Sequence, residues 1–288
     1  MRIGIGQATP PGNTVFKRIH WARKYGFDAF ELLCSPVPAQ FCGVYAPDLP
    51  FAAIKELKDE LASFASVTLH APFQNVFDTS LVSVNPKVRE ASIQDILFTI
   101  RLAEAVGGSV VTCHSGWTSS QADPKQVQDN LIASLRELSA EAGAVRIALE
   151  VADWFLPLEN YELLRELALP NIGITLDIGH AHFAVWDKPA YAAFGSVAEF
   201  VRQFGDLILS LHVHDFDGET DHIELGTGHI DLAAIIAALR EVRYTGDLTL
   251  ELNPDLCGPE SILRSKRVLE ELLEAEVRLP METDASPQ

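Results

Sequence analysis

The stretch Ile208-Leu209-Ser210-Leu211-His212 has the composition of a buried β-strand and ends on a residue type that binds metal ions. Five other apolar stretches end in the same way, on a histidine, a glutamate or an aspartate, and they are residues 66–70, 110–114, 147–150, 172–177 and 248–251. Segments with apolar residues at helical spacing separate them, for example Ile93, Ile96, Leu97 and Ile100. This alternation is typical of repeated β-α units with parallel strands.

Eight such units can be placed along the chain, from a strand near residues 2–6 to a last helix near residues 259–276. The sequence therefore predicts an α/β fold, a single (β/α)8 TIM barrel over residues 1–278, with an open doubly wound sheet as the structural alternative. The regular repetition favours the closed barrel. Residues 279–288, which carry two prolines and polar side chains, are predicted to form a flexible C-terminal tail.

The composition disfavours several classes of protein. The net charge is −18, from 40 acids against 22 lysines and arginines, and no basic run provides the positive stripe that a duplex-binding surface normally carries, so nucleic acid is not the expected partner. No apolar run has the length of a membrane span, and residues 1–6 are predicted to be the first strand rather than a signal peptide. The four cysteines form no CxxC pair, which is typical of reduced thiols. We expect a cytoplasmic enzyme without membrane partners; assembly into a homo-oligomer is left open.

In a barrel of this kind, the C-terminal strand ends meet at one mouth, where active sites lie. Carboxylates and imidazoles gathered there suit hard or borderline divalent cations. Strands at opposite sides of the barrel supply Glu150 and Glu251, and the strands between them supply Asp177 and His212. These four side chains can hold one cation and leave positions for water or substrate. A second ion at His70 and His114 and a third at the loop residues His180 and His222 extend the predicted ligand set.

Several segments, in this order, resemble the xylose-isomerase-like TIM-barrel superfamily. They are His70-Ala71-Pro72, Leu176-Asp177-Ile178-Gly179-His180, Leu211-His212-Val213-His214-Asp215 and Leu225-Gly226-Thr227-Gly228-His229-Ile230-Asp231. The resemblance covers essentially the whole barrel. That superfamily contains sugar and sugar phosphate isomerases and epimerases, and also zinc-dependent apurinic-site endonucleases.

Similarity to the epimerases implies a single catalytic ion, usually manganese, magnesium, cobalt or zinc, bound by Glu150, Asp177, His212 and Glu251. Glu150 and Glu251 would also move protons on opposite faces of a keto sugar, and His180 would bind a substrate oxygen. Similarity to the endonucleases implies instead a cluster of three zinc ions, with the added ligands His70, His114, His180 and His222. The chain departs from the endonuclease pattern at Thr220, where that pattern has an aspartate. Because the two branches imply one ion and three ions, we expect between one and three.

Other side chains near the strand ends are candidates for substrate contact. Trp117 lies in a loop after a strand, where an aromatic ring can wall a sugar pocket. His214 lies on the same strand face as His212; it is predicted to bind substrate, with support of a metal ligand as the alternative. Glu31 either faces the mouth or makes a structural pair. We expect a metal-dependent isomerase or epimerase acting on a small sugar or sugar phosphate, and the alternative is an apurinic-site endonuclease or phosphodiesterase.

Overall fold

The structure is a computed structural model that describes residues 1–35, 42–73, 79–185 and 187–275. The predicted tail, residues 279–288, lies outside the described residues. Eight parallel strands close into one barrel, in the order β1-β10-β9-β6-β5-β4-β3-β2, which confirms the predicted (β/α)8 fold and rules out the open sheet. The barrel strands are β1 Arg2–Gly6, β2 Ala29–Leu33, β3 Ser66–His70, β4 Val110–Cys113, β5 Arg146–Glu150, β6 Ile172–Asp177, β9 Ile208–Val213 and β10 Asp247–Leu250.

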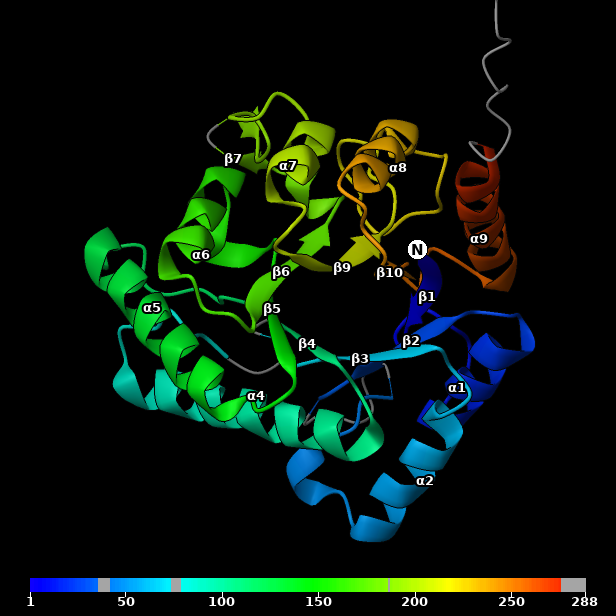
Figure 1. Ribbon diagram of the computed structural model, residues 1–288, viewed down its shortest axis with the longest axis horizontal. Helices are drawn as coiled ribbons and strands as arrows, with labels where there is room; N and C mark the ends of the chain where they lie inside the picture. The colour runs from blue at the N-terminus through cyan, green and yellow to red at the C-terminus, as the bar shows by residue number, and fades with distance from the viewer. Residues whose placement is uncertain (36–41, 74–78, 186, 276–288) are drawn as a thin grey trace, which may run out of the picture.

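The helices form a ring outside the strands (Figure 1). They are α1 Val15–Lys24, α2 Phe51–Leu61, α4 Pro86–Val106, α5 Pro124–Glu141, α6 Glu162–Leu167, α7 Val197–Phe204, α8 Leu232–Glu241 and α9 Pro259–Glu274. Short 3-10 helices supplement them at η1 Ala46–Asp48, η2 Asp153–Phe155, η3 Leu158–Tyr161 and η4 His180–His182. A small hairpin, β7 Ala184–Val185 with β8 Lys188–Pro189, lies in the loop after β6. No helix in the described ranges is long and apolar enough to cross a membrane.

Local sequence signals explain where the long helices begin and end. The side chain of Asn85 accepts a hydrogen bond from the backbone N–H of Lys87, and proline occupies the first turn of α4. Asp123 caps α5 in the same way, again with proline in the first turn. Such caps satisfy N–H groups that have no partner within the helix. The left-handed conformation of Gly107, with φ of 86°, ends α4 and turns the chain into β4.

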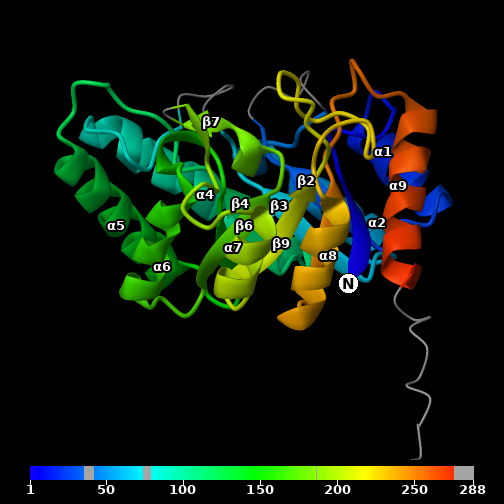
Figure 2. The same cartoon turned by 90° about the horizontal axis from the view of Figure 1, so that it is seen from above.

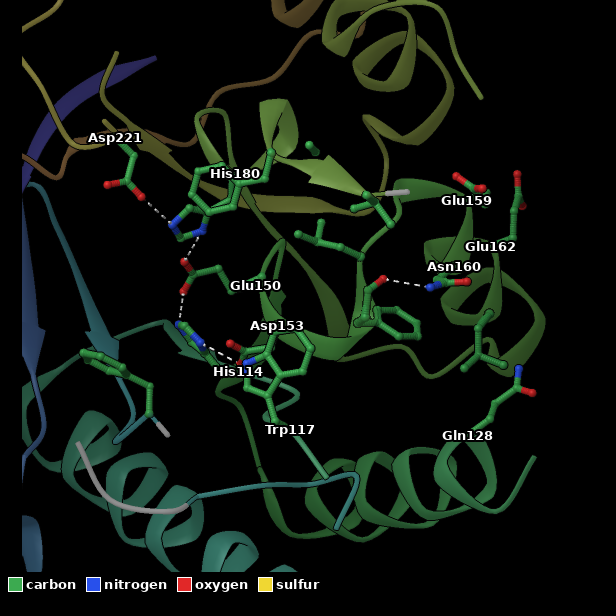
Figure 3. A pocket seen from close by; sticks show the side chains of 18 of the residues that line it. His114, Trp117, Gln128, Glu150, Asp153, Glu159, Asn160, Glu162, His180 and Asp221 are labelled. Carbon is green, nitrogen blue, oxygen red and sulfur yellow. Dashed lines mark hydrogen bonds and ion pairs between the residues drawn. The ribbon is translucent and has the colours of Figure 1, made fainter. Parts of the chain in front are cut away.

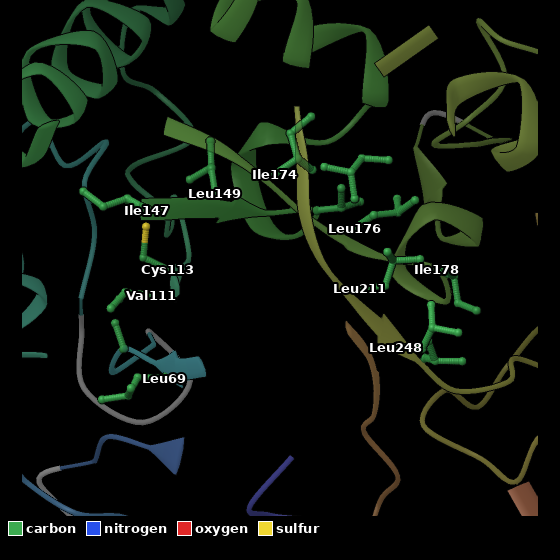
Figure 4. Packing of buried hydrophobic residues seen from close by; sticks show 14 of the residues in the cluster. Leu69, Val111, Cys113, Ile147, Leu149, Ile174, Leu176, Ile178, Leu211 and Leu248 are labelled. Carbon is green, nitrogen blue, oxygen red and sulfur yellow. The ribbon is translucent and has the colours of Figure 1, made fainter. Parts of the chain in front are cut away.

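The side chains of the barrel strands alternate between two environments. The side chains that face the helices are apolar and belong to one continuous core, and Figure 4 draws Leu69, Val111, Leu149, Leu176 and Leu211 among them. Cys113 also belongs to this core and is a free thiol; burial raises its pKa to about 12, which leaves it unreactive. The adjacent residues on each strand face the barrel interior.

The barrel interior below the mouth is polar. Glu31 on β2 is 2% exposed and accepts hydrogen bonds from the hydroxyls of Thr68 (3.2 Å) and Thr112 (3.5 Å). The Thr112 hydroxyl in turn lies 2.8 Å from that of Thr175. TIM barrels usually fill this space with branched apolar side chains. Here a buried carboxylate surrounded by hydroxyl groups takes the place of those apolar side chains. We infer that this layer supports the side chains at the strand ends above it.

Candidate metal centre

Three groups of metal-ligand side chains meet at the C-terminal mouth of the barrel. In each group the ligand atoms lie within 4.8 Å of one another. The core group is Glu150, Asp177, His212 and Glu251; the 70–114 group is His70, His114 and Glu150; the 180–222 group is Asp177, His180, His214 and His222. Glu150 and Asp177 each belong to two groups. The structure therefore brings together all eight residues that the sequence predicted as metal ligands.

The strands place these side chains because their ends are level at the mouth. His70, Glu150 and Asp177 are the last residues of β3, β5 and β6, while His114 and Glu251 directly follow β4 and β10. Asp177 and His212 are directly paired in the register of β6 and β9. Figure 2 shows the loop that contains β7 at the end of the barrel opposite the N-terminus. The site therefore lies at the C-terminal ends of the strands, the usual location in TIM barrels.

The core group has the composition of a divalent-cation site. His212 Nδ1 is buried and has no hydrogen-bond partner among the described residues. It lies 2.8 Å from Glu251 Oε2, 3.4 Å from Glu150 Oε1 and 3.9 Å from Asp177 Oδ2. Three carboxylates around one unsatisfied imidazole nitrogen are costly to bury without a cation. The residues present thus fit a bound metal ion.

Glu31 fixes the orientation of the His212 ring. Its Oε1 lies 3.0 Å from His212 Nε2, so the Nε2 proton is donated to Glu31 and Nδ1 faces the core group, where it would offer its lone pair to a bound cation. A carboxylate behind a ligating histidine is a common means of fixing the ring and its tautomer. Both readings of Glu31 from the sequence are therefore partly right: it points toward the mouth, and it makes a structural pair there.

The two histidines of the 70–114 group converge on a single oxygen. His70 Nε2 and His114 Nε2 lie 3.0 Å and 2.9 Å from Glu150 Oε2. Their other nitrogens are held by acceptors, namely the carbonyl of Ala71 at 2.7 Å and Asp153 Oδ2 at 2.9 Å. Sequence reasoning missed Asp153, whose backbone has a φ of 58°; its only sequence signal is its position three residues after Glu150.

In the 180–222 group, the ring contacts of His180 and His222 with carboxylate oxygens are longer than those of the 70–114 group. His180 Nδ1 lies 3.5 Å from Asp177 Oδ2 and 3.6 Å from Glu150 Oε1, and its Nε2 lies 3.9 Å from Asp221 Oδ2. His222 Nδ1 lies 3.3 Å from the same oxygen of Asp221. Although Thr220 departs from the endonuclease pattern, Asp221 thus supplies a carboxylate beside both histidines.

The charges of the centre shift the protonation of its members. Burial alone would lower the pKa of His114, but the charges of Glu150 and Asp153 outweigh it and hold that pKa well above its usual value. Burial would raise the pKa of Glu150, and the neighbouring His114 and His212 instead lower it strongly. The pKa of Glu251 falls to about 2, against the effect of burial, because His212 and His222 lie close. The carboxylates are therefore ionised at neutral pH.

The pKa of His222 gives a prediction for the metal-free protein. Burial lowers this pKa, but Asp221 and Glu251 raise it from 6.5 to about 9. Because the folded-state pKa is the higher one, the protonated ring stabilises the metal-free fold below the unfolded value, and this contribution is lost as the pH rises through about 9. A metal-bound ring carries no such proton. We expect the melting temperature of chelator-treated protein to fall across this window, and that of metal-loaded protein to fall less.

Calorimetric melting across the pH window checks this expectation. The His222→Gln variant, freed of metal, serves as the control and should give a flatter pH dependence than the parent chain. Equal slopes for the two metal-free proteins would show that His222 does not carry the effect.

A cavity of about 1350 Å³ opens over the centre. His114, Glu150, His180 and Asp221 gather on one side of it, and polar residues of α5 and of the η3–α6 segment, such as Gln128 and Glu162, lie on the other (Figure 3). Trp117 lines the cavity and is 49% exposed. His180 and Trp117, both predicted to contact substrate, are therefore placed where a bound molecule would reach them.

His214 was predicted to bind substrate, with support of a metal ligand as the alternative. It is 0% exposed and is absent from the described lining of the cavity, which favours the alternative. Its ring turns away from the opening toward Asp177, with Nε2 3.0 Å from Asp177 Oδ1. β9 ends at Val213, so the strand alternation that places His212 does not determine the direction of the His214 side chain.

The lining of the cavity is strongly acidic. Lys125 is the one lysine among its described lining residues, which include no arginine, and its ammonium group is paired with Asp129 at 2.6 Å. The acidic lining residues are Glu150, Asp153, Glu159, Glu162, Glu166, Asp221 and Glu251. A phosphate group would find no free guanidinium among these residues.

The fold and the site together define the class: this is a TIM-barrel protein with a candidate metal centre of carboxylates and imidazoles at the mouth of the barrel. More specifically, the chain belongs to the xylose isomerase-like TIM barrel family, whose model matches residues 19–272. This match confirms the family that the motifs indicated.

The chain is also similar to individual proteins over most of its length. The uncharacterized protein MJ1311 of Methanocaldococcus jannaschii is 26% identical, covering 95% of this chain and 90% of that protein. An L-ribulose 3-epimerase of Methylomonas sp. is 26% identical, covering 82% of this chain and 77% of the relative. The crystal structure of a D-tagatose 3-epimerase-like protein superposes with a TM-score of 0.76 at 24% identity, covering 96% of this chain and 98% of the other. At that identity the superposition shows the shared fold alone.

Proposed function

We propose that the protein is a divalent-metal-dependent isomerase or epimerase that acts on a sugar. The observation that carries the proposal is that Glu150 and Glu251 both belong to the core group and both line the cavity. Two carboxylates that reach one bound substrate from different strands are suited to remove a proton and return one. The L-ribulose 3-epimerase among the relatives supports the same class of reaction.

The chemistry follows from the positions of the two glutamates. A cation held by Glu150, Asp177, His212 and Glu251 would polarise the carbonyl of a keto sugar and acidify the neighbouring C–H bond. Glu251, whose side chain is 22% exposed, takes that proton while the electron pair of the C–H bond moves toward the carbonyl oxygen. Glu150 passes a proton from the protonated ring of His114, whose Nε2 lies 2.9 Å from its Oε2, to the opposite face of the same carbon and so inverts it. Glu251 then releases its proton to solvent and His114 takes one up; the reverse reaction exchanges the roles of the two glutamates.

The remaining lining residues hold the sugar. His180 lies beside Glu150 and Asp177, and Asp221 lies beside His180; both side chains are placed to bind hydroxyl groups. The aromatic rings of Phe73, Trp117 and Phe183 line the same cavity and suit the apolar faces of a sugar ring. The acidic lining favours an uncharged sugar over a sugar phosphate.

A metal-dependent phosphodiesterase is the second candidate function. The specific observation in its favour is that the 70–114 and 180–222 groups join the core group through Glu150 and Asp177. Clustered ions of this kind can activate water and stabilise both oxygens of an in-line displacement. The net charge of −18 and the acidic cavity oppose binding of a nucleic-acid backbone.

Substrate assays with metal-loaded protein test the two candidates against each other. Protein loaded with Mn²⁺, Co²⁺ or Zn²⁺ is incubated with L-ribulose, D-tagatose or D-fructose, and the products are separated by chromatography. A parallel sample receives a duplex oligonucleotide with one abasic site. We expect an epimeric or isomeric sugar and no nicking. Nicking without sugar turnover would reject the isomerase in favour of the phosphodiesterase.

A further inference from the structure

His214 is a fully buried histidine at the metal centre, and both of its ring nitrogens are engaged within the protein. Nδ1 lies 2.8 Å from the backbone nitrogen of His222, which donates its proton to it. Nε2 lies 3.0 Å and 3.1 Å from the two carboxylate oxygens of Asp177. The ring thus connects two members of the metal-ligand set that are distant in sequence.

These contacts determine the tautomer of the ring. Because the His222 N–H points at Nδ1, that nitrogen must present its lone pair and carries no proton. The proton of the neutral ring is then on Nε2 and is donated to Asp177. The Nδ1 contact with the carbonyl of Asp215, at 3.1 Å, is accordingly not a hydrogen bond. With its lone pair and its proton both used, the ring has no electron pair left for a cation.

The consequence is a fixed orientation of Asp177. Its Oδ1 accepts hydrogen bonds from His214 Nε2 and from the backbone N–H of His180, the latter at 2.7 Å. Its Oδ2 is the oxygen that lies nearest His212 Nδ1, at 3.9 Å, and so faces the core group. We propose that His214 is a positioning residue: it holds Asp177 with Oδ2 toward the metal and secures the backbone that carries His222.

Gly179 provides the space for this ring. A Cβ added at Gly179 would overlap the His214 ring, lying 2.6 Å from Nδ1 and 2.8 Å from Nε2. On its other side the ring is stacked on His222, with centroids 3.9 Å apart and planes inclined by 11°. The glycine between Asp177 and His180 in the sequence is therefore explained by the imidazole that packs against it.

Metal-binding titrations of substituted proteins test this role, which rests on the proposed metal centre and not on the identity of the sugar. Co²⁺ affinity and stoichiometry are measured by competition with a chromophoric chelator. His214→Ala should weaken binding at the core group by about 10- to 100-fold, the usual cost of losing an outer partner of a ligand. His214→Gln, whose amide N–H can still donate to Asp177, should recover most of that loss. His182→Ala, a histidine outside the three groups, should bind as the parent chain does.

Gly179→Ala provides an independent variant, because it displaces the ring without removing any ligand, and it should weaken Co²⁺ binding as His214→Ala does. Circular dichroism shows whether each variant is folded. If Gly179→Ala does not fold, the alanine and glutamine substitutions at His214 are enough for the test. If His214→Ala binds Co²⁺ as tightly as the parent chain, the proposed role of His214 is wrong, and the proposed metal centre is unaffected. The role is also wrong if both His214 variants lose one ion per chain while the remaining ions bind unchanged, because His214 would then be a metal ligand. A parent chain that binds no ion would overturn the proposed metal centre as well.

Discussion

Replacing Glu251 by glutamine is expected to lower kcat by about 10²- to 10⁴-fold, the usual contribution of a positioned proton-transfer group, while the fold is retained. Glutamine has nearly the shape of glutamate but cannot accept the proton. The low pKa of Glu251, about 2, keeps the carboxylate ionised and ready to act as a base at neutral pH. Steady-state assays with the sugar that the parent chain converts best give the rate, and circular dichroism checks the fold.

Glu260→Gln is the matched control for this variant. Glu260 lies in the first turn of α9 and its side chain is 92% exposed, so the same chemical change there should leave kcat unaltered. If Glu251→Gln turns over sugar at nearly the parent rate, the assignment of Glu251 to proton transfer is wrong.

Removal of metal is expected to abolish turnover and to lower the melting temperature. Without a cation, the carboxylates of Glu150, Asp177 and Glu251 lie around His212 with only imidazoles to balance their charge. A ligand present at about 1,000 times its Kd stabilises a fold by about 4 kcal/mol, so the change in melting temperature should be large. Dialysis against a chelator followed by addition of Mn²⁺, Co²⁺ or Zn²⁺ should restore both properties.

Two controls separate loss of metal from damage to the protein. Chelated protein that regains activity on addition of a divalent ion has not unfolded irreversibly. The Asp177→Asn variant, which lacks one charged member of the core group, should require more metal for the same recovery. Full activity in exhaustively chelated protein would contradict a metal-dependent reaction.

The sequence predicted the barrel and the polar side chains at its strand ends because both follow from simple periodicities. Alternation along each strand separates Leu69 from His70 and Leu149 from Glu150, and the parallel arrangement brings the strand ends to one mouth. The supporting residues could not be predicted in the same way. Asp153, with a φ of 58°, reaches His114 only through a loop conformation that is uncommon for residues other than glycine.

The direction of His214 and the role of Glu31 depend on contacts between segments far apart in the chain. Glu31 and His212 are separated by 181 positions, and no local pattern relates them. His214 follows the last residue of β9, and its position depends on the space left by Gly179. The extent of the cavity is likewise a property of packing, since α5 and α6 form its outer wall.

Exchange with solvent shows whether two carboxylates transfer protons beside a bound metal ion. Metal-loaded protein is incubated in D₂O with the sugar that it converts, and the product is examined by NMR. Proton transfer by Glu150 and Glu251 predicts deuterium at the inverted carbon next to the carbonyl, and none in a sample treated with chelator. Product that forms without deuterium at that carbon would contradict proton transfer by these two glutamates.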